Sequence, residues 1–368
     1  MKKTDDRLMD IFQHLHTHPE ISWEEKETTA YIAGLLQKEG IFVSLFDDCT
    51  GLIAEIGSGK PVVAVRADID ALWQEVDGVF QANHSCGHDA HMSIVIGAIL
   101  QLKSRITNGT VRFIFQPAEE TGSGALKMVE KGAVDDADYL FGIHLRPIEE
   151  LPFGKITPAI HHGAVAFLRG KISGDDAHGA RPHQGTNAID ILSSLNEQLK
   201  LIHFSPFEPY SVKMTHVEAG GQSLNIIPGS AKFGLDIRAQ KNSVLRDMQA
   251  IIEKKIKQLS ALFGVKIEAE WLKVTPGAEV DAEAEELLRQ SILEYGGQEM
   301  LAAPLITSGS DDFHFYTIKR PHLKAAMMGI GADLKPGLHH PHMSFDPRAI
   351  HIGADVLTWA VLNACQES

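Results

Sequence analysis

The stretch VVAVRADID, residues 62–70, decides the fold class, because it is an apolar run that ends in two aspartates. A run of this kind is typical of a strand that is buried on both faces of a parallel sheet. The stretches VRFIFQP at 111–117 and YLFGIHL at 139–145 have a similar character, and helical patterns lie between the runs. Strands that alternate with helices predict an α/β fold with a mostly parallel central sheet flanked by helices.

The sequence pattern around this core divides the chain into three parts. Residues 164–275 have the order strand, helix, strand, strand, helix, strand, which predicts an inserted ferredoxin-like α+β domain. After this block, a helix, a strand and a last helix return to the character of the first part. We therefore predict a discontinuous main domain built from residues 1–163 and 276–368, with the inserted domain between its two parts.

The charge balance of the 368-residue chain excludes some classes of partner. Lysine and arginine total 34 against 48 for aspartate and glutamate, so the formal net charge is −14. Such a surface repels polyanions, and we expect neither nucleic acid nor an anionic membrane as a partner. The N-terminal residues lack the apolar core of a signal peptide, so we expect a cytoplasmic protein. Cys49, Cys86 and Cys365 are widely separated and predict no disulfide framework.

Ionisable residues follow the predicted core strands at their carboxyl ends. The first strand leads to Asp68 and Asp70, the second to Glu119 and Glu120, and the third contains His144. Ligands bind at the carboxyl ends of the strands in open α/β sheets. We therefore expect these side chains to converge on one site.

The stretch NHSCGHDAHMS, residues 83–93, adds Cys86 and His88 at the start of a predicted helix. Sulfur, imidazole and carboxylate donors from distant segments suit a catalytic metal site that keeps open coordination positions. The alternative is a buried thiol beside a hydrogen-bonded core histidine. We favour metal binding, because this density of polar groups is costly to bury without a metal.

The adjacent acids Glu119 and Glu120 favour hydrolytic chemistry. Neighbouring residues that leave a strand point in different directions, so one carboxylate can bind metal while the other holds a proton from water. A solvated surface pair is the alternative for an isolated pair of glutamates.

Other histidines leave alternatives open. His14 and His18 would share one face of a helix, where a solvated or hydrogen-bonding role competes with metal binding. The loop DAHGARPHQGTNAI at 176–189 contains His178 and His183 before a predicted helix. It could cap that helix or bind an anion, or it could present a histidine that donates a hydrogen bond to a developing oxyanion.

Eight motifs follow one another along the chain: HTHPEISWEEKET, RADIDAL, HSCGHDAHM, FIFQPAEETGSGALKMVEKG, GIHL, AHGARPHQGTNAI, SLNIIPGSAKFGLDIR and SGSDDFHFY. They occur in the order seen in the aminoacylase-like two-metal metallopeptidases, which the chain resembles over nearly its whole length. Within that family it is most similar to the branch of bacterial N-acyl-amino-acid amidohydrolases, hippurate hydrolases and indole-3-acetyl-amino-acid hydrolases.

The resemblance implies two divalent metal ions held by five ligands, Cys86, His88, Glu120, His144 and His339. His340 and His342 are close rivals for the last position. It also implies that Glu119 is the general base and that His178 polarises the scissile carbonyl, in some relatives across a dimer. Asn225 and Arg238 match positions suited to the substrate carboxylate or the oxyanion, and arginine fits a carboxylate bidentately.

One region departs from the family pattern. Trp73 stands where relatives usually have proline, and the following loop QEVDGVFQAN at 74–83 is short. We expect this loop, with Trp73 and Phe80, to border the pocket for the acyl group. The substrate would then differ from that of the commonest relatives.

The sequence therefore predicts a metal-dependent amidohydrolase that cleaves N-acyl amino acids or related small conjugates with metal-activated water. Zinc, manganese and cobalt are all compatible with the donors. The inserted domain would act as a lid and would offer an edge strand for a homodimer. The alternatives are a metallo-dipeptidase or aminopeptidase with free-amine substrates, and a non-catalytic conjugate-binding protein. The complete ligand set and Glu119 count against the last.

Overall fold

The structure, a computed structural model, describes the backbone of residues 2–366 and the side chains of residues 7–366. This part of the chain forms two compact units. Unit 1 comprises the chain up to His161, Glu279–Ile306 and the chain from Asp312 on, and unit 2 comprises His162–Ala278 and Thr307–Asp311. The changes of unit at 161/162 and 278/279 lie close to the expected boundaries at 163/164 and 275/276.

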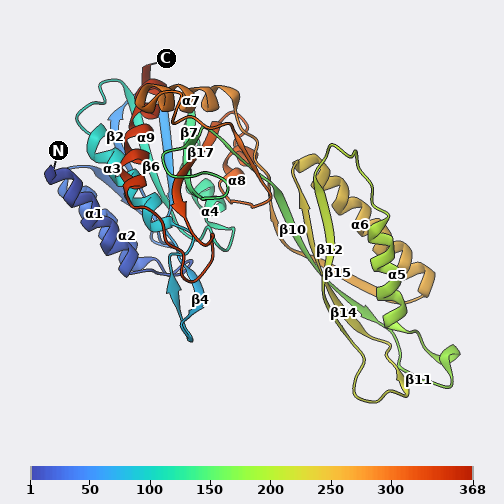
Figure 1. Cartoon of the computed structure of the whole chain (residues 1–368). Helices are drawn as coiled ribbons and strands as arrows, with labels where there is room; N and C mark the ends of the chain where they lie inside the picture. Colours follow the sequence, from blue (N-terminus) through green and yellow to red (C-terminus); the bar gives the residue numbers. More distant parts are fainter. Residues whose placement is uncertain (1, 367–368) are drawn as a thin grey trace. The chain divides into compact units, whose positions relative to one another are not determined.

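Within the described residues, unit 1 is built on a seven-stranded mixed sheet with the order β1-β2-β6-β3-β7-β17-β8 (Figure 1). The central strands β6, β3, β7 and β17 are parallel, and the strands at both edges are antiparallel to their neighbours. The predicted α/β fold is confirmed, with the parallel arrangement confined to the centre of the sheet. In spatial order the strands are β1 (Phe42–Leu45), β2 (Leu52–Ser58), β6 (Gly109–Gln116), β3 (Val62–Asp68), β7 (Tyr139–Pro147), β17 (Lys324–Leu334) and β8 (Ile156–Thr157).

Helices cover both faces of this sheet, which explains the apolar run in β3. Val63 and Val65 pack into the hydrophobic cluster on one face, and Val62 and Ala64 pack into the cluster on the other. The first cluster includes residues of α1 (Lys2–Thr17), α2 (Lys26–Lys38), α3 (His88–Leu102), α7 (Ala282–Gly296) and α9 (Arg348–Gln366). The second includes residues of α4 (Gly124–Glu130) and α8 (His314–Lys319).

The segment expected as a short loop after Leu72 is a β-hairpin. Strand β4 (Leu72–Val76) pairs with β5 (Val79–Asn83) through a turn at Asp77 and Gly78. Both turn residues have positive φ, at 51° and 82°, which is the conformation that the Asp-Gly pair favours in tight hairpins. The turn residues Asp77 and Gly78 therefore favour the formation of hairpin β4–β5.

Unit 2 has the predicted ferredoxin-like arrangement. Within its described residues, four antiparallel strands lie in the order β12-β14-β10-β15, and α5 and α6 cover one face of the sheet (Figure 1). The bounds are β10 (Ala164–Ser173), α5 (Ala188–Lys200), β12 (Tyr210–Ala219), β14 (Ala231–Ala239), α6 (Asn242–Phe263) and β15 (Lys266–Thr275). Shorter elements of unit 2 are β11 (Ala177–His178), η1 (Pro182–Gln184) and β13 (Ile226–Ile227), while β9 (Ile160–His162) and β16 (Leu305–Thr307) pair with each other at the changes of unit. No helix among the described residues is long and apolar enough to cross a membrane.

Candidate metal centre

Four of the five residues expected to bind metal lie at the carboxyl ends of central strands and at the start of α3, and the fifth, His339, lies in the loop after β17. His144 lies in β7, and the chain after β6 carries Glu119 and Glu120. Cys86 and His88 stand on either side of Gly87, where α3 begins. Gly87 has a φ of +84°, and a Cβ there would lie 3.2 Å from Leu145 Cδ1. The turn that presents the thiol and the imidazole therefore requires glycine.

The structure brings all five expected ligands into groups that share members. One group is Cys86, His88 and His144, and another is Cys86, Glu120 and His339, with ligand atoms within 4.8 Å of one another. His88 Nε2 lies 3.8 Å from Glu120 Oε1, and His339 Nε2 lies 3.6 Å from Glu120 Oε2. Because Cys86 belongs to both groups, the donors form one continuous cluster.

The imidazoles are held in the tautomer that metal binding requires. His88 Nδ1 donates to the backbone oxygen of Asp70 at 2.8 Å, and His144 Nδ1 donates to the backbone oxygen of Leu145 at 2.6 Å. In both rings the Nε2 atom faces the cluster. His88 Nε2 is buried and accepts no hydrogen bond from the described residues. A bound cation would satisfy this nitrogen, so the donors fit a metal site.

The charges of the cluster also fit a cation. Burial raises the pKa of the Glu120 carboxyl to about 7 and raises the pKa of the Cys86 thiol well above its usual range. Burial lowers the pKa of His144 well below its ordinary value, which leaves the neutral ring that binds metals. The pKa of His88 is raised, because Asp68 and Cys86 outweigh the effect of burial. Divalent cations would favour the ionised thiol and carboxyl and would displace the His88 proton.

Beneath the cluster lies a buried network of charged groups. Arg66 donates to Asp68 Oδ2 at 2.6 Å, to Asp312 Oδ1 at 2.9 Å and to Gln116 Oε1 at 3.0 Å. These side chains are completely buried. Although burial opposes ionisation, His88, Arg66 and His91 hold the pKa of Asp68 well below its usual range. The network keeps an anion beside the imidazole of His88, at 3.7 Å between Asp68 Oδ2 and Nε2.

His91 connects this network to β7. Its Nε2 accepts from the backbone N–H of Leu145 at 2.9 Å, so its Nδ1 carries the proton and donates to Asp68 Oδ1 at 2.7 Å. The contact fixes the strand segment next to His144. The roles of His91, Arg66 and Asp312 were not predicted from the sequence. The sequence did indicate that Arg66 has a buried partner, because a charge inside an apolar strand needs one.

Glu119, the expected general base, lies at the edge of the same cluster. Its side chain is 12% exposed, its Oε2 lies 3.9 Å from His88 Nε2, and its Oε1 accepts from the backbone N–H of Asp312 at 3.4 Å. Trp73 and Phe80, expected at an acyl pocket, are about 60% and 59% exposed on hairpin β4–β5. Their role stays a prediction.

In unit 2, His178 and Asn225 lie together and are exposed. His178 of β11 pairs with Ile226 of β13, and Gly179 N–H donates to the backbone oxygen of Asn225 at 2.7 Å. His178 Nδ1 accepts from the backbone N–H of Ala180 at 3.0 Å. The neutral ring therefore carries its proton on Nε2, where it can donate to a ligand.

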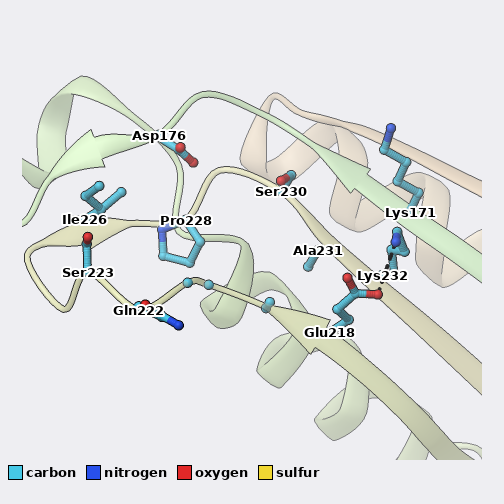
Figure 2. A pocket seen from close by; sticks show the side chains of 13 residues that line it. Lys171, Asp176, Glu218, Gln222, Ser223, Ile226, Pro228, Ser230, Ala231 and Lys232 are labelled. Atoms are coloured by element: carbon cyan, nitrogen blue, oxygen red, sulfur yellow. Dashed lines mark hydrogen bonds and ion pairs between the residues drawn. The ribbon is translucent and has the colours of Figure 1, made fainter.

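A cavity of about 380 Å³ lies beside this loop and is drawn in Figure 2. Ser223 and Ile226, on either side of Asn225, line it, and Lys232 binds Glu218 at 3.1 Å on its wall. The cavity is polar and open, and it is formed by residues of unit 2.

Arg238 lies elsewhere in unit 2. It stands near the end of β14 and binds Asp236 through two contacts, of 2.8 and 3.1 Å. It also lines a small cavity of about 180 Å³ with Tyr210 and Ser308. The structure therefore does not bring Arg238 beside His178 and Asn225.

The chain is similar to a known protein family, to curated relatives and to solved structures. The sequence pattern of the family described as Peptidase family M20/M25/M40 matches residues 64–363. The N-acetyl-L-cysteine deacetylase of Bacillus subtilis is 31% identical over 94% of this chain and 85% of its own. The IAA-amino acid hydrolase ILR1-like 6 of Arabidopsis thaliana is 32% identical over 95% of this chain and 78% of its own. The crystal structure of the YXEP protein of Bacillus subtilis, described as a dinuclear metal binding peptidase, matches with a TM-score of 0.85 and 28% identity over 99% of each chain.

Proposed function

The chain belongs to peptidase family M20/M25/M40, and we propose that it hydrolyses the amide bond of N-acyl amino acids or related small conjugates. It is a metal-dependent hydrolase that acts on amide bonds. The relatives named as an N-acetyl-L-cysteine deacetylase and an IAA-amino acid hydrolase support this substrate class, because both names describe an acyl group removed from an amino acid. The observation that carries the proposal is the continuous donor cluster with Glu119 at its edge.

The proposed ligands are Cys86, His88, Glu120, His144 and His339. When bound, two divalent ions would activate water and polarise the scissile carbonyl. His339 is preferred over its neighbours because its Nε2 faces Glu120, whereas His342 Nε2 lies 3.3 Å from Asp77 at the tip of hairpin β4–β5. Zinc, manganese or cobalt would suit this donor set. The free cysteines found among the described residues agree with a reducing, cytoplasmic compartment.

The reaction needs one proton to be moved twice. Glu119 takes the proton from water as the oxygen attacks the amide carbon, and then gives it to the nitrogen as the C–N bond breaks. His178 Nε2–H donates to the oxygen that develops negative charge, and Asn225 can donate beside it. Arg238 would hold the substrate carboxylate. The products are a carboxylic acid and an amino acid.

A homodimer is part of this proposal. Arg238 lies seven residues along β14 from Ala231, roughly 24 Å at the usual rise of a strand. His178 lies by β13, which precedes the start of β14 in the chain. One small substrate cannot contact both side chains of the same chain, so His178 would come from a second copy. The edge strand β12 offers a surface for that pairing.

Mixing two inactive variants tests the shared site. Glu119→Gln chains lack the base and His178→Ala chains lack the donor, but a mixed dimer would contain one complete site if His178 acts across the interface. We expect mixing, after subunit exchange, to restore hydrolysis. Light scattering must show a dimer, and a mixture that stays inactive after proven exchange would contradict the shared site.

A substrate panel tests the activity itself. We expect hydrolysis of N-acetyl and N-benzoyl amino acids, measured as amino acid released, and little hydrolysis of free dipeptides. A preference for free-amine dipeptides would identify a dipeptidase instead. Binding of conjugates without turnover, in protein with full metal content, would identify a binding protein.

A further inference from the structure

We propose that hairpin β4–β5 is a clamp that positions His339, and that the side-chain amides of Gln74 and Asn83 thereby set the affinity for one of the two cations. The inference rests on the proposed function, in which His339 is a metal ligand. It concerns residues to which neither the family pattern nor the sequence motifs assign a role in metal binding.

His339 needs such a clamp because its backbone is strained. Its φ is +64°, in the left-handed region, which costs a residue with a side chain about 1–2 kcal/mol. It lies in a loop that is closed by a bridge between Lys335 and Ser344. Its imidazole is 55% exposed, whereas Cys86 and His144 are each 6% exposed. Packing alone therefore does not fix His339 as it fixes the other donors.

Hydrogen bonds hold the backbone of this loop on both sides of the His339 side chain. The N–H of His339 donates to the backbone oxygen of Ser85 at 2.7 Å, and its own oxygen accepts from Gln74 Nε2 at 3.1 Å. Asn83 Nδ2 donates to the backbone oxygen of Pro341 at 2.9 Å. The donors to both carbonyl groups are side chains of hairpin β4–β5.

The two amides also support each other. Asn83 Nδ2 lies 2.9 Å from Gln74 Oε1, and the pairs Leu72–Asn83 and Gln74–Gln81 place Gln74 and Asn83 on the same face of the hairpin. The opposite face carries the exposed Trp73 and Phe80. One face of the hairpin thus carries the side chains that bind the loop of His339.

The clamp should affect one cation more than the other. His339 groups with Cys86 and Glu120, whereas the group of Cys86, His88 and His144 does not include it. Without the amide donors, the strained backbone can relax and move the imidazole away from Glu120. The second group keeps its ring orientations through the carbonyl oxygens of Asp70 and Leu145.

Zinc titration of the full-length protein tests this, with a competing chelator to resolve two affinities. We expect Gln74→Met, which keeps the length of the side chain but cannot donate, to weaken one zinc site about 10–100-fold and leave the other unchanged. Asn83→Ser is an independent variant with the same expected effect. Gln81→Ala is the matched control, because Gln81 is exposed and pairs with Gln74 across the hairpin, but no hydrogen bond joins it to the loop among the described residues.

The clamp also predicts a kinetic signature that general destabilisation would not give. Saturating zinc should restore kcat in Gln74→Met with KM unchanged, while the urea midpoint stays that of the parent protein. His339→Ala tests the ligand assignment separately from the clamp, since this variant should lose one zinc site completely. If His339→Ala loses that site while Gln74→Met and Asn83→Ser bind both ions with parental affinity, the clamp is wrong and the proposed function stands. If His339→Ala keeps both sites, its assignment as a ligand fails, and the clamp with it.

Discussion

The donor cluster of unit 1 and the His178 loop of unit 2 differ in how far their side chains are exposed to solvent. Cys86, His88 and His144 are at most 6% exposed, whereas His178 and Asn225 are exposed to solvent. Buried side chains are held in one orientation, and backbone carbonyl oxygens accept hydrogen bonds from the rings of His88 and His144. Hydrogen bonds from exposed donors contribute little free energy until a substrate excludes water around them. The buried donors of unit 1 are therefore oriented in advance, whereas the exposed donors of the His178 loop are not.

Glu119→Gln should give the largest effect, because it removes the proposed base and leaves the buried cluster intact. We expect kcat to fall by about 10²–10⁴. Metal content should stay at the parental value, which mass spectrometry can check on the same samples. Near-parental turnover in this variant would place the base elsewhere.

Arg66→Leu tests how far the buried network supports unit 1. The change leaves Asp68 and Asp312 buried without their shared guanidinium, which costs about 3–5 kcal/mol in the free energy of unfolding. Urea denaturation measures that loss. Lys200→Ala is the matched control in unit 2, because it breaks an exposed pair with Glu197 and should leave the midpoint unchanged. A loss below about 1 kcal/mol for Arg66→Leu would mean that the network is not needed for stability.

His178→Ala tests the exposed side of the comparison. We expect kcat to fall by about 10²–10³, the usual effect of losing one donor to an oxyanion. Metal content and the urea midpoint should not change, because the ring is exposed. His183→Ala, in the same loop, is the control and should retain activity. A His178→Ala enzyme within about twofold of the parent would remove this residue from the mechanism.

The smallest expected effect is a pH dependence that comes from Glu25, a buried carboxyl near the cluster. Burial raises its pKa to about 7, from 4.5, although Thr50 donates a hydrogen bond to it. Between pH 4.5 and about 7, the folded state therefore keeps a proton on Glu25 that the unfolded state has released. The contribution of this proton to the free energy of unfolding is fully present below pH 4.5 and is lost as the pH rises through about 7.

The variant Glu25→Gln isolates that contribution. Between pH 5 and pH 8, the free energy of unfolding should fall by about 2–3 kcal/mol more for the parent than for the variant. Urea denaturation at both pH values gives the difference. Parallel pH profiles for the two proteins would show that Glu25 does not titrate between these values.

Much of the fold followed from periodicity and from turn chemistry. The apolar run of β3 predicted a strand buried on both faces, and the helix predicted to start at Cys86 and His88 is α3, with bounds His88–Leu102. The hairpin turn was also encoded, since Asp77 and Gly78 are a tight-turn pair, although only a loop was expected at 74–83.

The site could be predicted only in part. Donors at strand ends were visible because parallel strands meet at one edge of a sheet. The pairing of Arg66 with Asp312 could not be predicted, because 246 residues separate them. A buried charge indicates that a partner exists but not which residue it is. Nor does sequence predict a left-handed backbone at His339, because that conformation is imposed by contacts distant in the chain.

Metal content combined with chelation tests the central claim most directly. The purified protein, supplied with zinc or manganese, should hold about two equivalents of metal by mass spectrometry. Hydrolysis of N-acetyl amino acids should be lost on chelation and should return when metal is added back. Protein that binds no metal, or amide hydrolysis that survives complete chelation, would contradict the assignment of this cluster as the catalytic centre.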